Sequence, residues 1–240
     1  MRTPAVGEAR MIPLRDDNPS GSKPFVTITL VVLCVLVFLW EFSLGTEGGQ
    51  RAIYALGVIP AVLLGDAQLP PDLSLVPPTA TVFTSMFMHG GWMHLIGNML
   101  YLWIFGDNVE DSMGHVRYLI FYFICGVAAV FAQAVPEPNS EIPMVGASGA
   151  ISGVLGAYVL LHPHAKVLVA VPLGFILHTM RLPAGLVLAL WFGLQLLSNT
   201  FAQSGGGVAF RAHIGGFVAG MVLVSVFKRR DVRLFAPARS

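Results

Sequence analysis

The sequence predicts an all-α, polytopic membrane protein, in which one domain forms a six-transmembrane-helix bundle. Its 240 residues are 55% hydrophobic and only 11% charged, whereas soluble domains carry about 25% charged residues. Apolar runs close to the length of a membrane span, about 20 residues, recur along the chain. Lys and Arg are also divided unequally, because 12 of the 14 fall on one side of the predicted membrane.

The first elements follow from composition. Residues 1–23 are polar and are expected to form a loosely folded tail, ahead of a membrane domain at residues 24–230 and a short tail at 231–240. The apolar run at 25–44 is too long for the core of a signal peptide, so it is predicted as the first span. Residues 45–82 are rich in Gly and Pro yet hold apolar pieces. Because a structureless soluble loop of this length is unusual, we expect an insertion lying in the membrane interface.

The remaining spans are predicted at residues 91–105, 116–135, 148–161, 183–197 and 209–227. The fourth has 14 residues, about 21 Å at about 1.5 Å per residue, which is too short to cross a bilayer from surface to surface. Ser148, its first residue, is therefore predicted to lie below the membrane surface, in a cavity. The apolar segment 167–177 is interrupted by Pro172 and Gly174 and is predicted to be interfacial.

The distribution of Lys and Arg places both termini in the cytoplasm, so Ser148 opens toward the outer face. The compact form, with no targeting peptide recognised, favours a bacterial inner (cytoplasmic) membrane. A net charge of +1 gives no reason to expect nucleic acid as a partner. Cys34 and Cys125 both fall in apolar runs, so no disulfide framework is expected.

Ser148 and His213 place a hydroxyl and an imidazole within two different apolar spans. Polar and ionisable groups at this depth are costly and point to function, and this pair is the minimum set for a serine nucleophile and its base. No Asp or Glu occurs at 73–106, 112–136 or 142–230, which favours a Ser–His dyad without a carboxylate. The nearest acids, Glu41, Asp107, Glu110 and Asp111, are predicted near the membrane surfaces.

His94 and Asn98 are four residues apart, so they share one face of the second span. Both can donate hydrogen bonds, and donors held together in an apolar surround suit an oxyanion hole. His89 lies at the start of this helix and is expected to bond the long loop or to hold a water. A metal shared by His89 and His94 is disfavoured, because they are five residues apart and have no carboxylate or thiolate neighbour. No metal or other cofactor is predicted.

Small residues mark the faces on which two spans can pack. The fourth span has Gly149 among several small residues, and the last has Gly216 and Gly220. Such residues allow membrane helices to approach closely. His213 lies three residues before Gly216, so packing of the two glycine faces would bring it against Ser148.

Together, these motifs resemble the rhomboid family of intramembrane serine proteases. The resemblance rests on three motifs and their order, and it extends from about residue 24 to residue 227. They are His-x4-His-x3-Asn at His89, His94 and Asn98, Gly-x-Ser-Gly at Gly146, Ser148 and Gly149, and Ala-His-x2-Gly-x3-Gly at Ala212, His213, Gly216 and Gly220. The fold that it implies is a six-helix, rhomboid-like bundle.

The resemblance also implies the site and the reaction. Ser148 matches the nucleophile, His213 the general base, and His94 and Asn98, with the Ser148 amide, the oxyanion donors. The supporting positions are His89, the glycines Gly146 and Gly149 beside the nucleophile, and the close-packing Gly216 and Gly220. The reaction would be endopeptidase cleavage in or next to transmembrane helices of protein substrates. These would enter from the lipid past a gate formed by the fifth span and residues 201–208.

The chain departs from some members at two places. Ala80 and Thr81 stand where these have Trp-Arg in the first loop, and Ser152 stands where they have a Tyr stacked on the catalytic His. We therefore expect packing or a hydroxyl to hold His213.

Two alternatives for the function remain: a catalytically silent rhomboid-like protein that binds transmembrane segments, and a transporter or channel. The sequence gives the transporter neither inverted repeats nor further intramembrane charges.

Overall fold

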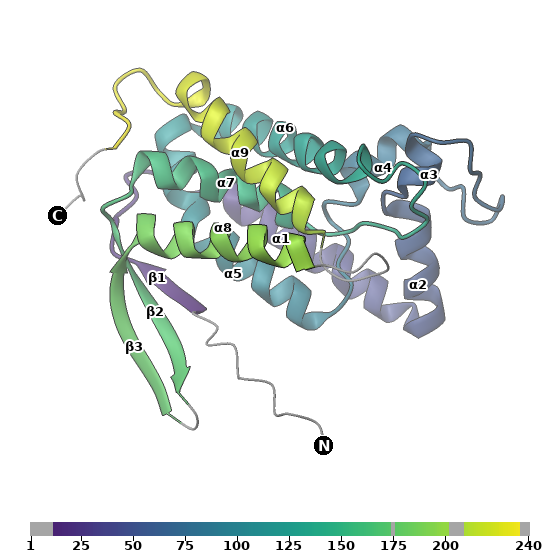
Figure 1. The fold of residues 1–240 in the computed structure, drawn as a ribbon, viewed down its shortest axis with the longest axis horizontal. Coiled ribbons are helices and arrows are strands. Elements are labelled where there is room, and N and C mark those ends of the chain that lie inside the picture. The colour runs from purple at the N-terminus through teal and green to yellow at the C-terminus, as the bar shows by residue number, and fades with distance from the viewer. Residues whose placement is uncertain (1–11, 174–175, 202–208, 236–240) are drawn as a thin grey trace.

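The computed structural model describes residues 12–173, 176–201 and 209–235, which are mainly helical (Figure 1). The helices are α1 (Phe25–Ser43), α2 (Gly45–Leu56), α3 (Pro60–Leu63), α4 (Pro78–Thr84), α5 (Trp92–Met113), α6 (His115–Ala134), α7 (Ser148–Leu161), α8 (Ala184–Phe201) and α9 (Phe210–Phe227). The strands are β1 (Ile12–Asp16), β2 (Lys166–Leu173) and β3 (Ile176–Pro183). The predicted spans correspond to α1 and to α5 through α9, although α5 continues well past the predicted end at residue 105.

Several described helices have the length and composition of membrane spans. Helices α1, α6 and α9 are long and apolar enough to cross a membrane, and α7 and residues 184–197 of α8 are shorter apolar helices. Large apolar side chains cover the outside of the bundle, including Leu36 on α1 and Val222 and Val226 on α9. An outer surface of this kind is suited to lipid rather than to water.

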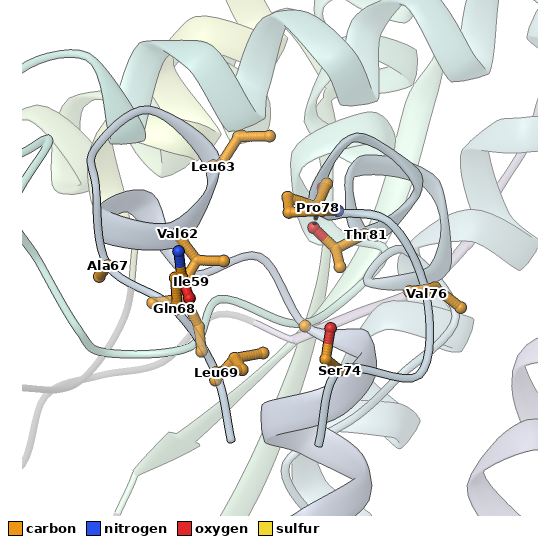
Figure 2. Close-up of a pocket in the computed structure, with 11 residues that line it drawn as sticks. Ile59, Val62, Leu63, Ala67, Gln68, Leu69, Ser74, Val76, Pro78 and Thr81 are labelled. Carbon is orange, nitrogen blue, oxygen red and sulfur yellow. Dashed lines mark hydrogen bonds between the residues drawn. The ribbon is translucent and has the colours of Figure 1, made fainter. Parts of the chain in front are cut away.

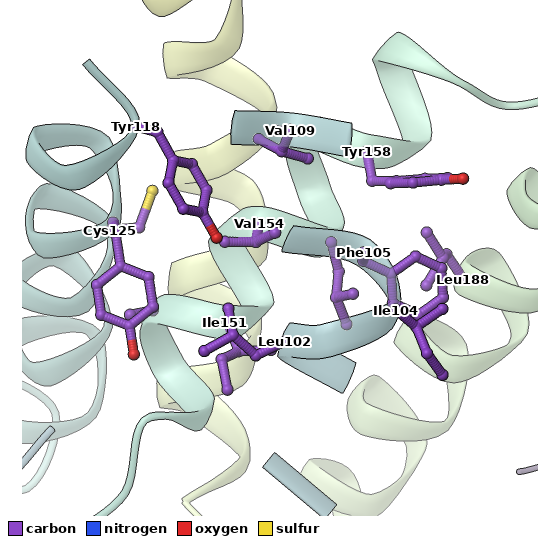
Figure 3. Close-up of a cluster of buried hydrophobic side chains, with 14 of the residues drawn as sticks. Leu102, Ile104, Phe105, Val109, Tyr118, Cys125, Ile151, Val154, Tyr158 and Leu188 are labelled. Carbon is purple, nitrogen blue, oxygen red and sulfur yellow. The ribbon is translucent and has the colours of Figure 1, made fainter. Parts of the chain in front are cut away.

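Helix α7 lies at the centre of the bundle, packed against α5, α6, α8 and α9. Most of its residues are buried, as expected for a helix that is apolar on every side. Figure 3 shows the core around it, where Ile151 and Val154 of α7 lie near Leu102 and Phe105 of α5. The helix that begins at Ser148 is therefore fixed on all sides by its neighbours.

A three-stranded antiparallel sheet of order β1-β2-β3 corrects the all-α prediction. Lys166 of β2 pairs with Pro183 of β3, and Val167 of β2 pairs with Asp16 of β1. The hairpin projects from one end of the bundle (Figure 1). The segment predicted as an interfacial run at 167–177 is thus mostly strand, and the tail predicted to be loosely folded contributes β1.

The physical reason for the sheet lies in the alternation of β2. Val167 and Val169 are fully buried, whereas Lys166 is exposed, so one face of the strand packs on the core. Branched side chains fit such a half-buried pleated surface. The sequence prediction of an interfacial segment overlooked that buried and exposed side chains alternate every second residue in this run.

The extended end of α5 binds the start of α1. Glu110 is fully buried and accepts hydrogen bonds from the backbone N–H groups of Val26 (2.9 Å) and Thr27 (2.8 Å). The first N–H groups of a helix have no partner inside it, and α1 has no capping side chain of its own. A carboxylate from α5 therefore completes the beginning of α1.

The insertion at residues 45–82 is folded into α2, α3 and α4 rather than being structureless. It encloses a cavity of about 190 Å³ lined by apolar residues such as Ile59, Leu63 and Leu69 (Figure 2). Val58 pairs with Met144 through mutual backbone hydrogen bonds, which joins the insertion to the segment that precedes α7. The insertion consequently packs at the end of the bundle where Ser148 lies.

Candidate functional site

The backbones of α7 and α9 are in direct contact through glycine. A Cβ atom at Gly216 would overlap the carbonyl oxygen of Gly149, and one at Gly220 would overlap that of Gly153. Only glycine allows this approach, as the small-residue pattern predicted. The contact brings together the first turns of the two helices, from which Ser148 and His213 project.

Ser148 and His213 form a hydrogen bond, as the spacing of the glycines led us to expect. The His213 Nε2 atom is 2.8 Å from the Ser148 Oγ atom, and both residues are half-buried. An imidazole that accepts the hydroxyl proton on Nε2 carries its own hydrogen on Nδ1. The pair thus has the geometry of a nucleophile and a base.

The second nitrogen of His213 contacts a residue that our sequence reasoning missed. The Nδ1 atom is 2.9 Å from the Oε1 atom of Gln195 on α8. The signal was present, because a glutamine within the apolar run of α8 is the kind of polar residue that bonds across membrane helices. Carboxylates act elsewhere, since Glu41 accepts the His89 backbone N–H and Glu110 completes the start of α1.

Besides the Ser148 hydroxyl, an amide and an aromatic ring contact His213. The Trp191 ring lies 6.0 Å from the imidazole, centroid to centroid, at an angle of 35°. Ser152, the residue in the position of the stacking tyrosine, donates its hydroxyl to the Ser148 carbonyl at 2.6 Å. We expected packing or a hydroxyl to hold His213, and the Trp191 ring supplies the packing.

His94 and Asn98 lie against Gly146, two residues before Ser148. A Cβ atom built on Gly146 would be 2.7 Å from His94 Nε2 and 3.6 Å from Asn98 Nδ2. Gly146 has a φ of +123°, a conformation that L side chains rarely adopt. Its N–H donates to the Ser85 carbonyl at 2.8 Å, which fixes the loop that leads into α7.

These two side chains, with the start of α7, present hydrogen-bond donors. His94 Nδ1 accepts the Gly90 N–H at 3.3 Å, so a neutral His94 carries its proton on Nε2, the atom that faces Gly146. Asn98 Nδ2 is buried and has no hydrogen-bond partner in the described part of the chain. The N–H of Ser148, at the first position of α7, has no partner inside the helix. Buried donors left open in this way are uncommon.

His89 is fully buried behind this group. Its ring packs edge-on against His94 with centroids 5.3 Å apart, and its Nδ1 atom is 3.1 Å from the Phe87 carbonyl oxygen. Its backbone N–H donates to Glu41 at 3.2 Å. Across the described residues, no cluster of three or more His, Cys, Asp or Glu side chains could hold a metal ion.

A small cavity adjoins Ser148. It measures about 40 Å³ and is lined by Ser148, Gly146, Ser85 and Ala212, among others. This is room for about one water molecule. The larger cavity of Figure 2 includes none of these residues and belongs to the insertion. The expected gate falls partly on residues 202–208, which lie outside the described residues.

Comparison with known proteins decides the family. The family model described as the Rhomboid domain matches residues 78–230, more than half of the chain. The chain belongs to the rhomboid family. As a rhomboid with several apolar helices, it is an integral membrane protein.

Relatives of this rhomboid occur in fungi, bacteria and plants. Rhomboid protein 1, mitochondrial, of Saccharomyces cerevisiae is 27% identical over 92% of this chain and 70% of its own length. The rhomboid protease GluP of Bacillus subtilis is 29% identical over 83% of this chain and 34% of its own length. RHOMBOID-like protein 5 of Arabidopsis thaliana is 29% identical over 59% of this chain and 42% of its own length. The rhomboid chain therefore spans less than half the length of the last two proteins.

Proposed function

We propose that this rhomboid is an intramembrane serine endopeptidase, which hydrolyses peptide bonds in or next to transmembrane helices of membrane-protein substrates. The observation that carries the proposal is the 2.8 Å hydrogen bond between Ser148 Oγ and His213 Nε2. Membership of a family whose relatives include a named rhomboid protease supports it. The alternative, a silent protein that only binds transmembrane segments, gives no reason for a nucleophile and a base to be so aligned.

In the proposed reaction, His213 Nε2 removes the hydroxyl proton while Ser148 Oγ attacks the carbonyl carbon of the scissile bond. The resulting tetrahedral adduct breaks its C–N bond, and His213 returns the proton to the leaving amine. Water, deprotonated by His213, then attacks the acyl-enzyme ester. The C–Oγ bond breaks, His213 returns the proton to Ser148 Oγ, and the new carboxyl end of the substrate is released. General acid–base transfer of this type contributes about 10²–10⁴-fold to rate.

Charge that develops on the substrate oxygen would be stabilised by three donors. They are His94 Nε2–H, Asn98 Nδ2–H and the backbone N–H of Ser148. Donors fixed in advance, in a site from which water is largely excluded, stabilise the transition state without reorganising. Gly146 has no Cβ atom, so no side chain at this position stands between these donors and the oxyanion.

The substrate enters sideways from the lipid, with α8 as one side of its path. A stable helix keeps its carbonyl groups hydrogen-bonded, so the cleaved segment must unwind locally. We therefore expect small, helix-breaking residues near the scissile bond. The reaction as proposed requires no metal or organic cofactor and no nucleic acid.

We also propose that six helices, α1 and α5 through α9, span a bacterial inner membrane, with both termini in the cytoplasm. The asymmetry of 12 Lys and Arg against 2 supports this orientation. Contacts of segments near the two ends of the chain also support it. The Asp17 N–H donates to the Lys166 carbonyl, and the Arg229 N–H donates to the carbonyl of Ser112, the penultimate residue of α5. A green fluorescent protein fused after residue 240 should fluoresce in a bacterial host, whereas alkaline phosphatase at that position should be inactive. The reverse pattern contradicts the orientation.

The activity is tested with purified protein in liposomes that contain a model transmembrane substrate. The wild type should cleave the substrate, and Ser148→Ala and His213→Ala should not. Ser225→Ala is the matched control, because it removes an exposed hydroxyl of α9 outside the site and should retain full activity. A substrate that stays intact with every variant but is co-purified supports the silent binder, and cleavage that survives Ser148→Ala places the nucleophile elsewhere.

A further inference from the structure

Gln195 is the residue on α8 whose side chain bonds the imidazole of His213. We infer that Gln195 is a positioning residue, which fixes His213 in the tautomer that a general base requires. The inference rests on the proposed function and adds a third member to the Ser148–His213 pair. It assigns to a neutral amide the orienting role that a carboxylate plays in a serine-protease triad.

The geometry determines the tautomer. His213 makes two hydrogen bonds, from Nδ1 to Gln195 Oε1 at 2.9 Å and between Nε2 and Ser148 Oγ at 2.8 Å. An amide oxygen can only accept, so Nδ1 must donate and Nε2 keeps its lone pair toward the serine. An amide nitrogen in that place would donate to Nδ1 and leave Nε2 protonated, and such a His213 could not take the proton of Ser148.

The position of Gln195 is fixed by packing of α8 on α9. Phe192 stacks on Phe217 of α9 with ring centroids 4.4 Å apart, and Trp191 lies 6.0 Å from His213. Gln195 follows Trp191 by four residues, so both lie on the α8 face that meets the imidazole. The amide is thus held by two aromatic contacts within about one turn of it.

A neutral partner also suits the electrostatics of this site. The two side chains that hydrogen-bond His213 in the described part of the chain, Gln195 and Ser148, are both uncharged, and Arg211, two residues before His213, pairs with Glu137 at 2.6 Å. An amide oxygen orients the imidazole without adding a negative charge that would favour the protonated imidazolium. An imidazole in this setting can accept the Ser148 proton on Nε2 while Nδ1 donates to Gln195.

Two substitutions of Gln195 separate orientation from charge. Gln195→Met keeps the length of the side chain but replaces the amide oxygen with a thioether sulfur, a much weaker acceptor, and we expect kcat to fall about tenfold while KM changes less than about twofold. Gln195→Glu restores an acceptor, so kcat should recover at high pH. The acid limb of its pH profile should move up by about one pH unit or more, because a carboxylate favours the imidazolium. The lipid-facing Val222→Ala on α9, which lies outside the site and outside the proposed substrate path, serves as the control and should behave as the wild type.

The readouts are kcat and KM against pH in liposomes, the rate at which a fluorophosphonate labels Ser148, and the unfolding temperature of each variant. The inference is overturned if Gln195→Met has unchanged kcat and labelling, or if Gln195→Glu has the pH profile of the wild type. In either case the proposed function still stands, provided that Ser148→Ala is inactive. If Gln195→Met unfolds early, the pH profile of Gln195→Glu decides. A wild type that neither cleaves nor labels refutes the proposed function, and the inference with it.

Discussion

Asn98 holds a buried amide donor with no partner among the described residues, next to the backbone of Gly146. A donor left open costs folding free energy, about 1–3 kcal/mol, and becomes useful only when an oxyanion forms. We predict that Asn98→Leu lowers kcat about 10²–10³-fold while the unfolding temperature stays the same or rises. Steady-state kinetics in liposomes and thermal unfolding in detergent measure the two effects. A fall in stability with unchanged kcat would instead make Asn98 a structural residue.

At the scale of elements, the contact between α7 and α9 sets the distance between nucleophile and base. A methyl group at Gly216 would overlap the Gly149 carbonyl, so Gly216→Ala must push the helices apart. Overpacking of this kind costs about 1–3 kcal/mol, and we predict both a lower unfolding temperature and loss of most cleavage. Gly193→Ala on α8 is the matched control for stability, because its methyl group would meet no described residue within 4 Å. Equal behaviour of the two variants would show that the close approach is not required.

The same elements show what the sequence could and could not predict. Glycine at regular spacing identifies the contacting faces of α7 and α9, so the meeting of Ser148 with His213 followed from local pattern. Gln195 did not, because leucines occur around most of α8 and leave its rotation about its own axis undefined. His162, just after α7, is buried, and its Nε2 atom lies 3.2 Å from the Ser112 Oγ atom of α5. That contact joins segments far apart in the chain, which a local pattern does not encode.

At the scale of the whole molecule, Asp16 connects the sheet to the bundle. Tyr158 of α7 donates its hydroxyl to the Asp16 carboxyl at 2.5 Å, and Asn108 of α5 donates its amide at 3.0 Å. Asp16 therefore joins strand β1 to helices α7 and α5. The hairpin and tail were missed from the sequence because this anchor consists of residues from three distant segments.

The pH dependence of stability follows from this anchor. Burial, only partly offset by the hydrogen bond from Tyr158, raises the pKa of Asp16 from the ordinary value of 3.8 to about 7. The folded protein thus binds a proton at Asp16 that the unfolded chain releases, and its contribution to stability is complete below about pH 4 and lost as the pH rises through about 7. We predict that the wild-type unfolding temperature falls between about pH 5 and about pH 8. Asp16→Asn, which mimics the protonated carboxyl, should flatten this profile and unfold about 2–4 °C higher at the alkaline end.

Thermal unfolding in detergent across this pH range measures the effect, with Asp231→Asn as the control for loss of an exposed carboxylate. Asp231 lies in the segment after α9 and 3.9 Å from Arg229, so its replacement should leave the slope of the profile unchanged. Parallel profiles for the wild type and Asp16→Asn would show that Asp16 is ionised in the fold at neutral pH. A steeper fall in Asp16→Asn would reverse the sign, and the carboxylate rather than the carboxylic acid would then hold β1 against α5 and α7.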